Sequence, residues 1–188
     1  MDTYTPTNDV CPSQEDIIEK HLLIPWWINL FTVVFIIICL LPFIVKYYFD
    51  PYMYSIIAVG LVFINIFCIY MHEHSHAWVL RNLNNDDPIV LVSLRKSYCK
   101  PQKAVPLPIF LIDLAAPSII PGILGIITAL LYIFTASEIV IWIFGLSSVF
   151  QFSAMYGDLY WIILLWKIPR NRCVICDGPT ATVYIPTK

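Results

Sequence analysis

The chain has 188 residues, of which 59% are hydrophobic and 13% are charged, and its formal net charge is −2. A soluble domain averages about 45–50% apolar and about 25% charged residues, so this composition excludes an ordinary soluble globular protein. The small negative charge comes without a basic tail or a base-stacking motif, so we expect no nucleic-acid partner. The apolar residues gather in long blocks, which is typical of a membrane protein.

Four apolar blocks predict about four transmembrane helices. They run from about Trp27 to Tyr48, Tyr54 to Trp78, Leu107 to Phe134 and Ile139 to Trp166. Blocks of this length can cross a hydrocarbon core of about 30 Å. The third block contains Pro117 and Pro121, which predict a kink or a broken helix. We therefore expect an all-α membrane protein whose partner is the lipid bilayer.

The polar segments divide the chain into three parts. Residues 1–26 form a polar N-terminal tail, 27–168 a four-span membrane domain, and 169–188 an extended C-terminal tail. The N-terminal tail carries five acids against one lysine, which is the wrong charge for a cleavable signal peptide. Cys173 and Cys176 form a lone CxxC, which we interpret as two ordinary thiols rather than a zinc site.

The basic residues predict which side of the membrane the loops face. Nine of the eleven lie in the loop at about 79–106 or in the tail after the fourth block: Arg81, Arg95, Lys96, Lys100, Lys103, Lys167, Arg170, Arg172 and Lys188. Four spans place both segments on the same side as the N-terminus, and the positive-inside rule makes that side cytoplasmic. We therefore expect a multi-pass integral membrane protein with cytoplasmic N- and C-termini.

The end of the second block carries the sequence MHEHSHAW, with an HExxH motif at His72–His76. On a helix, His72 and His76 are one turn apart, so both imidazoles can bind one Zn²⁺. Glu73 lies beside them and can take a proton from a water molecule that the metal activates. His74 points to roughly the opposite face. Ionisable residues inside a span are candidates for function, which favours a metal site over a chance motif or a polar helix end.

A catalytic zinc takes three protein ligands, so a third ligand is needed. The other acids inside the apolar blocks are Asp113 and Asp158. At about 1.5 Å per residue, both lie at roughly the depth of the histidines below the cytoplasmic edge. Depth leaves the choice between the two aspartates open, and the one that is not a ligand would cap a helix or bond two helices together.

The later segments of the chain follow the HExxH motif in a recognisable order. A basic loop is followed by LIDLAAPSIIPGI at Leu111–Ile123 and by MYGDLYW at Met155–Trp161. This order, over about Tyr54 to Pro186, resembles the integral-membrane zinc metalloproteases related to site-2 proteases, and most closely the DUF3267-type zincins. The resemblance implies a membrane-embedded zinc-dependent peptidase that hydrolyses membrane or membrane-associated substrates near the cytoplasmic face.

The resemblance also implies roles for single residues. In site-2 proteases an aspartate from a later span completes the zinc site, and here that role falls on Asp158. Site-2 proteases have this aspartate before a glycine, whereas Gly157 precedes Asp158. Asp113 is therefore the stronger alternative ligand, and Asp177, in the turn-like CDGPT segment, is a weaker one. The implied zinc ligands are His72, His76 and Asp158, with Glu73 as the general base.

The loop between the second and third blocks contains the strand-like piece PIVLVSL at Pro88–Leu94. We therefore predict a short strand-like cytoplasmic loop. In site-2 proteases a strand in this place can pair with an unwound peptide or transmembrane protein substrate through backbone hydrogen bonds. A surface hairpin that only links two spans is an equal alternative.

Two amides and two other functions stay open. Asn65 and Gln151 lie seven residues before His72 and Asp158, so they can line a wet cavity, contact the ligands, polarise the scissile carbonyl or bond two helices. A non-catalytic metal-binding or transport protein would use the same histidines without needing Glu73. A pseudoprotease scaffold would present substrates to another protease.

Overall fold

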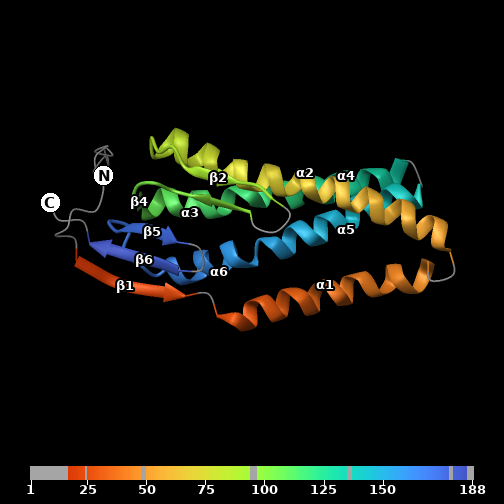
Figure 1. The fold of residues 1–188 in the computed structure, drawn as a ribbon, viewed down its shortest axis with the longest axis horizontal. Helices are drawn as coiled ribbons and strands as arrows, with labels where there is room; N and C mark the ends of the chain where they lie inside the picture. The colour runs from red at the N-terminus through yellow and green to blue at the C-terminus, as the bar shows by residue number, and fades with distance from the viewer. Residues whose placement is uncertain are drawn as a thin grey trace. The chain divides into compact units, whose positions relative to one another are not determined.

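The computed structural model describes residues 17–23, 25–47, 50–93, 97–134, 137–177 and 180–185, and most of them are helical (Figure 1). The elements in chain order are β1 (Ile17–Leu23), α1 (Trp26–Tyr47), α2 (Pro51–Leu83), β2 (Ile89–Leu91), β3 (Tyr98–Lys100), β4 (Val105–Pro106), α3 (Leu107–Ala115), the 3₁₀ turn η1 (Ala116–Ser118), α4 (Ile119–Phe134), α5 (Glu138–Ala154), α6 (Tyr156–Leu165), β5 (Cys173–Asp177) and β6 (Thr180–Ile185).

Four helical segments of the described chain are long and apolar enough to cross a membrane. They are Trp26–Lys46, Pro51–Leu83, Leu107–Phe134 and Glu138–Leu165. Short strands lie between the second and third segments, so the predicted fold class is confirmed. By the length and composition of these helices, the chain is a multi-pass membrane protein.

Two of the four spans are broken. The third is interrupted by η1, which contains Pro117, as the sequence predicts, because proline lacks the N–H that a continuous helix needs. The fourth is interrupted at Met155, which lies at φ −78° and ψ −5° and ends α5. The sequence analysis did not predict this second break, because no proline lies there. Its effect is to start a new helix, α6, two residues before Asp158.

The chain divides into two compact units, and α2 contributes to both. One unit contains Met1–Ile24, Glu73–Ala116 and Trp161–Lys188. Its sheet has the strand order β1-β6-β5-β4, and all three pairings are antiparallel. In Figure 1, β1 lies along β6 and β5 lies on the other side of β6. A strand from the predicted N-terminal tail therefore pairs with a strand from the predicted C-terminal tail.

The core of this unit joins the sheet to α3 and the end of α2. Its fully buried side chains include Leu80, Leu107, Val174 and Val183. A separate hairpin pairs β2 with β3, with Val90 opposite Cys99, so the strand predicted at Pro88–Leu94 is present but shorter. Some residues that the sequence analysis used lie outside those whose side chains the structure describes: Arg95, Lys96, Asp177 and Lys188.

The other unit contains Pro25–His72 and Pro117–Tyr160. Its helices are α1, the first two-thirds of α2, α4, α5 and the first half of α6. Its sequence has only four charged residues: Lys46, Asp50, Glu138 and Asp158. Large apolar side chains, such as Phe63, Ile126 and Val45, are exposed along its helices. Exposing these apolar side chains to water would cost free energy, and charged residues, which are costly in hydrocarbon, are few. This unit is therefore the part of the chain suited to the hydrocarbon core of a membrane.

Candidate metal centre

The two histidines of the HExxH motif lie on α2, which is an unbroken helix from Pro51 to Leu83. A helix of this length is about 50 Å long, so it exceeds a hydrocarbon core of about 30 Å. His72 and His76 are four residues apart and therefore lie on the same face of the helix. His76 is buried and His72 is half-buried.

His72 faces the first turn of α6. Its Nε2 lies 3.5 Å from Oδ2 of Asp158. The break at Met155 places this carboxylate at a helix N-terminus, where the helix dipole favours a negative charge. Tyr156 and Tyr160, each two residues from Asp158, pack against α1. Tyr156 makes an edge contact with Phe31, with 5.4 Å between the ring centroids. The aromatic contacts hold the first turn of α6, and so they hold the aspartate.

His76 faces α3. Its Nδ1 lies 3.1 Å from Oδ1 of Asp113, and both side chains are buried. When Asp113 is ionised, its carboxylate can only accept hydrogen bonds, and in that state Nδ1–H of the imidazole donates and Nε2 carries the lone pair. Histidines that bind a metal often donate their other ring N–H to a carboxylate in this way. The contact through Nδ1 therefore leaves Nε2 of His76 available to bind a metal.

One ligand atom each from His72, His76 and Asp158 lies within 4.8 Å of the other two. Ligands at about 2.0–2.2 Å in a tetrahedral zinc site are about 3.4 Å from one another, and the 3.5 Å between His72 and Asp158 fits that spacing. Two imidazoles and one carboxylate also form a donor set that catalytic zinc sites use. The residues present are therefore compatible with a bound metal ion.

Glu73 is adjacent to this group and is only 8% exposed. It shares its surroundings with Cys99 of strand β3. Burial, together with the nearby carboxylates of Asp113 and Glu73, raises the pKa of the Cys99 thiol to about 12. Glu73 of α2 and Cys99 of the hairpin β2–β3 therefore interact electrostatically. A local sequence pattern could not predict this interaction, because Glu73 and Cys99 are 26 positions apart in the chain.

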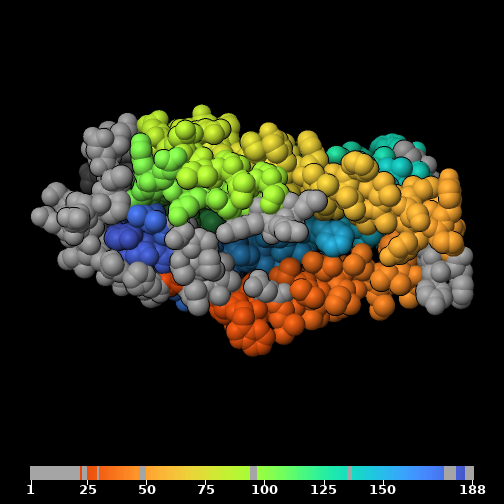
Figure 2. Space-filling model, viewed as in Figure 1, coloured from red at the N-terminus to blue at the C-terminus, as the bar shows by residue number. Residues whose placement is uncertain are grey.

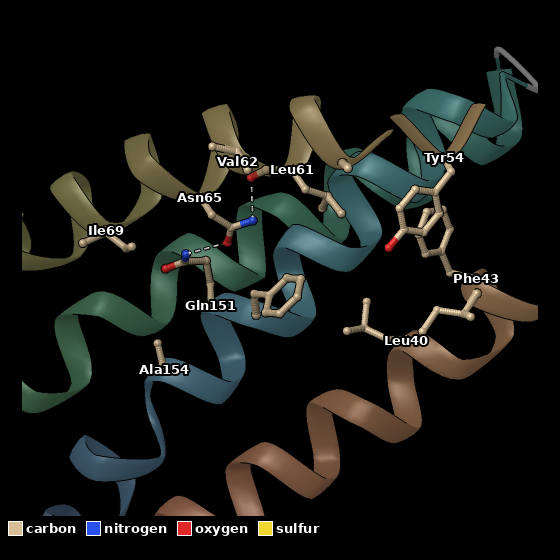
Figure 3. Close-up of a pocket in the computed structure, with 12 residues that line it drawn as sticks. Leu40, Phe43, Tyr54, Leu61, Val62, Asn65, Ile69, Gln151 and Ala154 are labelled. Atoms are coloured by element: carbon tan, nitrogen blue, oxygen red, sulfur yellow. Dashed lines mark hydrogen bonds between the residues drawn. The ribbon is translucent and has the colours of Figure 1, made fainter. Parts of the chain in front are cut away.

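The amides Asn65 and Gln151 bond to each other. Nε2 of Gln151 donates to Oδ1 of Asn65 at 3.0 Å, which joins α5 to α2 (Figure 3). Nδ2 of Asn65 donates to the carbonyl of Leu61 at 2.9 Å and to the hydroxyl of Ser147 at 3.3 Å. Of the four interpretations left open by the sequence, these contacts correspond to a hydrogen bond between helices.

The structure separates the candidate residues into two kinds. His72, His76 and Asp158 come together, whereas Asp113 lies outside this group and contacts Nδ1 of His76. His74 is not part of the three-residue group. Depth alone could not distinguish the two aspartates, because that distinction depends on which imidazole nitrogen each one approaches.

No protein-family model, no curated protein and no solved structure matches the chain. The chemistry of the candidate centre therefore has to be inferred from its own residues and from the motif that carries them.

Proposed function

We propose that the protein is a membrane-embedded zinc-dependent peptidase, related to the site-2 proteases, that hydrolyses membrane or membrane-associated proteins near the cytoplasmic face. One observation carries the proposal: the ligand atoms of His72, His76 and Asp158 lie within 4.8 Å of one another. The two histidines lie on the unbroken helix α2, and Asp158 lies on α6 of the broken fourth span. The buried Glu73 stands next to the first of them. If His72 and His76 were only the polar end of a helix, Asp158 would not need to lie near them, and the three ligand atoms would not need to be within 4.8 Å of one another.

The proposed chemistry divides between ligands and base. A zinc ion held by the three residues would lower the pKa of a water molecule toward about 7 and so supply a nucleophile at neutral pH. The carboxylate of Glu73 accepts the proton of the attacking water. It then passes that proton to the nitrogen of the leaving amine, which makes Glu73 a general base and then a general acid.

Asp113 has a positioning role in this proposal. Its carboxylate holds Nδ1–H of His76 at 3.1 Å. The bond fixes the tautomer and the ring orientation, and it makes the other nitrogen a better ligand. The metal-carrier alternative would use the same contact, so Asp113 supports a metal site without deciding between catalysis and transport.

The β2–β3 hairpin supports an extended peptide as substrate. Strand β2 pairs with β3 on one side, and no other described strand pairs with it. Ile89 and Leu91, on either side of Val90 in the strand, are exposed. A free edge can give backbone hydrogen bonds to an extended peptide, and a helical substrate must unwind before its peptide bonds can be cut.

The sheet-containing unit faces the cytoplasm in this proposal. That unit contains six basic residues whose side chains the structure describes: Arg81, Lys100, Lys103, Lys167, Arg170 and Arg172. The guanidinium of Arg170 lies 4.8 Å from the ring centroid of the exposed Trp166, a pairing that suits a membrane interface. The positive-inside rule makes this side, with both termini, cytoplasmic.

The test measures zinc per chain in detergent-purified protein and the turnover of short single-span membrane proteins in cells. Three proteins are compared: wild type, His72→Ala, and His74→Ala as the matched control on the same helix. We expect His72→Ala to lose both zinc and turnover, and His74→Ala to keep both. Zinc retained in His72→Ala would refute the metal centre. Zinc lost without any change in turnover would leave a metal-binding protein and refute the peptidase.

A further inference from the structure

The turn after α2 contains a buried acid that the candidate metal centre does not use. Asp86 is only 4% exposed, although it lies just beyond the end of α2 at Leu83. Asn85 precedes it at φ 46°, in the left-handed region that asparagine adopts more readily than most residues. The backbone N–H of Asp86 donates to the carbonyl of Leu80 at 3.2 Å. The chain therefore turns back on the end of α2 at this point.

The Asp86 carboxylate joins this turn to the segment that follows β3. Its Oδ2 accepts the backbone N–H of Gln102 at 3.0 Å and that of Lys103 at 3.3 Å. Gln102 also donates from Nε2 to the carbonyl of Asp87 at 2.6 Å, and Lys103 donates from Nζ to the carbonyl of Asn85 at 3.1 Å. Four hydrogen bonds therefore connect the two segments. Figure 2 shows the yellow-green end of α2 and the green residues after β3 on the same face.

The buried charge determines which of these bonds matter most. A carboxylate near the C-terminal end of a helix is unfavourable for the helix dipole, so Asp86 does not stabilise α2 by its charge. A buried carboxylate that loses its hydrogen-bond partners costs free energy, so the two backbone N–H groups are held beside it. Hydrogen bonds from N–H groups to an ionised carboxylate are also about twice as strong as those between neutral groups. The Asp86 carboxylate is therefore the group that fixes the segment after β3.

The base of the β2–β3 hairpin is close in sequence to these bonds. Strand β2 begins at Ile89, soon after Asp86, and β3 ends at Lys100, just before Gln102. Ile89 and Lys100 are the pair at the base of the hairpin. A two-stranded hairpin is only marginally stable by itself, and this one has three residue pairs. The bonds to Asp86 therefore close the hairpin at its base and order both of its strands.

We propose that Asp86 is a positioning residue. Its carboxylate fastens the base of the β2–β3 hairpin to the end of α2, and so it holds the edge of β2 with which no described strand pairs ready for an extended peptide. An edge that is ordered before the peptide arrives loses less conformational entropy on binding. The role toward a peptide rests on the proposed function, whereas the fastening of the hairpin does not.

The first arm of the test measures backbone hydrogen exchange in the detergent-purified full chain, in peptides that cover residues 99–103. Asp86→Ala should speed exchange at Gln102 and Lys103 about 10–100-fold, because each amide loses a hydrogen bond to a charged group. Asp86→Asn keeps an oxygen that can accept both N–H groups but loses the charge, so it should speed exchange less. Asp87→Asn is the matched control, because its side chain is 89% exposed, and it should leave exchange unchanged.

The second arm measures the turnover in cells of a short single-span protein that persists when the cells carry Glu73→Gln. When this substrate is made at a low level, Asp86→Ala should slow its turnover at least about fivefold, and overproduction of the substrate should restore it, because a disordered edge weakens binding and leaves the chemistry intact. Zinc per chain should stay at the wild-type level. Asp86→Asn should recover most of the turnover, and Glu73→Gln should stay inactive at both substrate levels.

Each result decides one part of the inference. Exchange at the wild-type rate in Asp86→Ala would overturn the fastening of the hairpin, and fast exchange with unchanged turnover would overturn the role toward the peptide. If Asp86→Ala fails to fold, Asp86→Asn is compared with Asp87→Asn, and equal exchange in these two variants would overturn the inference. If no protein persists in Glu73→Gln cells, the proposed function and the role toward the peptide fail together, and the exchange measurement still decides the fastening.

Discussion

The two aspartates near the HExxH motif should differ sharply when each is changed to asparagine. Asp113 is 5% exposed and bonds to His76 through Nδ1, so Asp113→Asn removes a charge but keeps an oxygen that can accept the same N–H. Loss of such a supporting partner typically costs about 10–100-fold in metal affinity. Because the acceptor survives, we expect a loss near about 10-fold, which is about 1.4 kcal/mol.

Asp158→Asn should be much more damaging. Its oxygen lies 3.5 Å from Nε2 of His72 and is one of the three grouped ligand atoms. A neutral amide is a poor zinc ligand, so only two strong ligands remain, and we expect a loss larger than about 100-fold. The assay is competition for zinc against a chromophoric chelator in detergent, with both variants at equal concentration. Weaker binding in Asp113→Asn than in Asp158→Asn would refute the assignment of ligand and support.

Three other predictions concern the amide pair, a buried thiol and the orientation. In a double-mutant cycle of Asn65→Leu and Gln151→Leu, unfolding in detergent should show a coupling of about 0.6–1.7 kcal/mol; independent effects would contradict the 3.0 Å bond. Because a pKa of about 12 keeps the Cys99 thiol protonated at pH 8, maleimide should label it about a thousandfold more slowly than an ordinary thiol with a pKa near 9, and fast labelling would contradict its burial. On intact cells an impermeant maleimide should label Asp50→Cys and not Lys167→Cys, and the reverse pattern would overturn the orientation.

The sequence predicts the spans well because they depend on local composition. Runs of apolar residues must lie in hydrocarbon, and Pro117 must interrupt a helix wherever the rest of the chain lies. The break at Met155 could not be predicted in the same way, because neither proline nor glycine occupies that position.

Long-range pairing accounts for the remaining differences. Strand β1 pairs with strand β6, and Ile17 lies opposite Ile185. Nothing in the sequence of either short strand indicates that it pairs with the other. The histidine pair could be predicted from a four-residue spacing on one helix. The different contacts of Asp113 and Asp158 could not, because they depend on the positions of α3 and α6 rather than on depth in the membrane.

The central claim is that the chain hydrolyses peptide bonds, and Glu73→Gln tests it most directly. Glutamine keeps the shape of Glu73 but cannot accept the proton, and general acid–base catalysis contributes about 10²–10⁴-fold. The measurement is the membrane proteome of cells that carry the wild type or Glu73→Gln, at equal expression and with zinc per chain determined for both. We predict that short single-span proteins persist uncut only in the variant, while its zinc content stays at the wild-type level. Unchanged proteomes with intact zinc occupancy would contradict the peptidase.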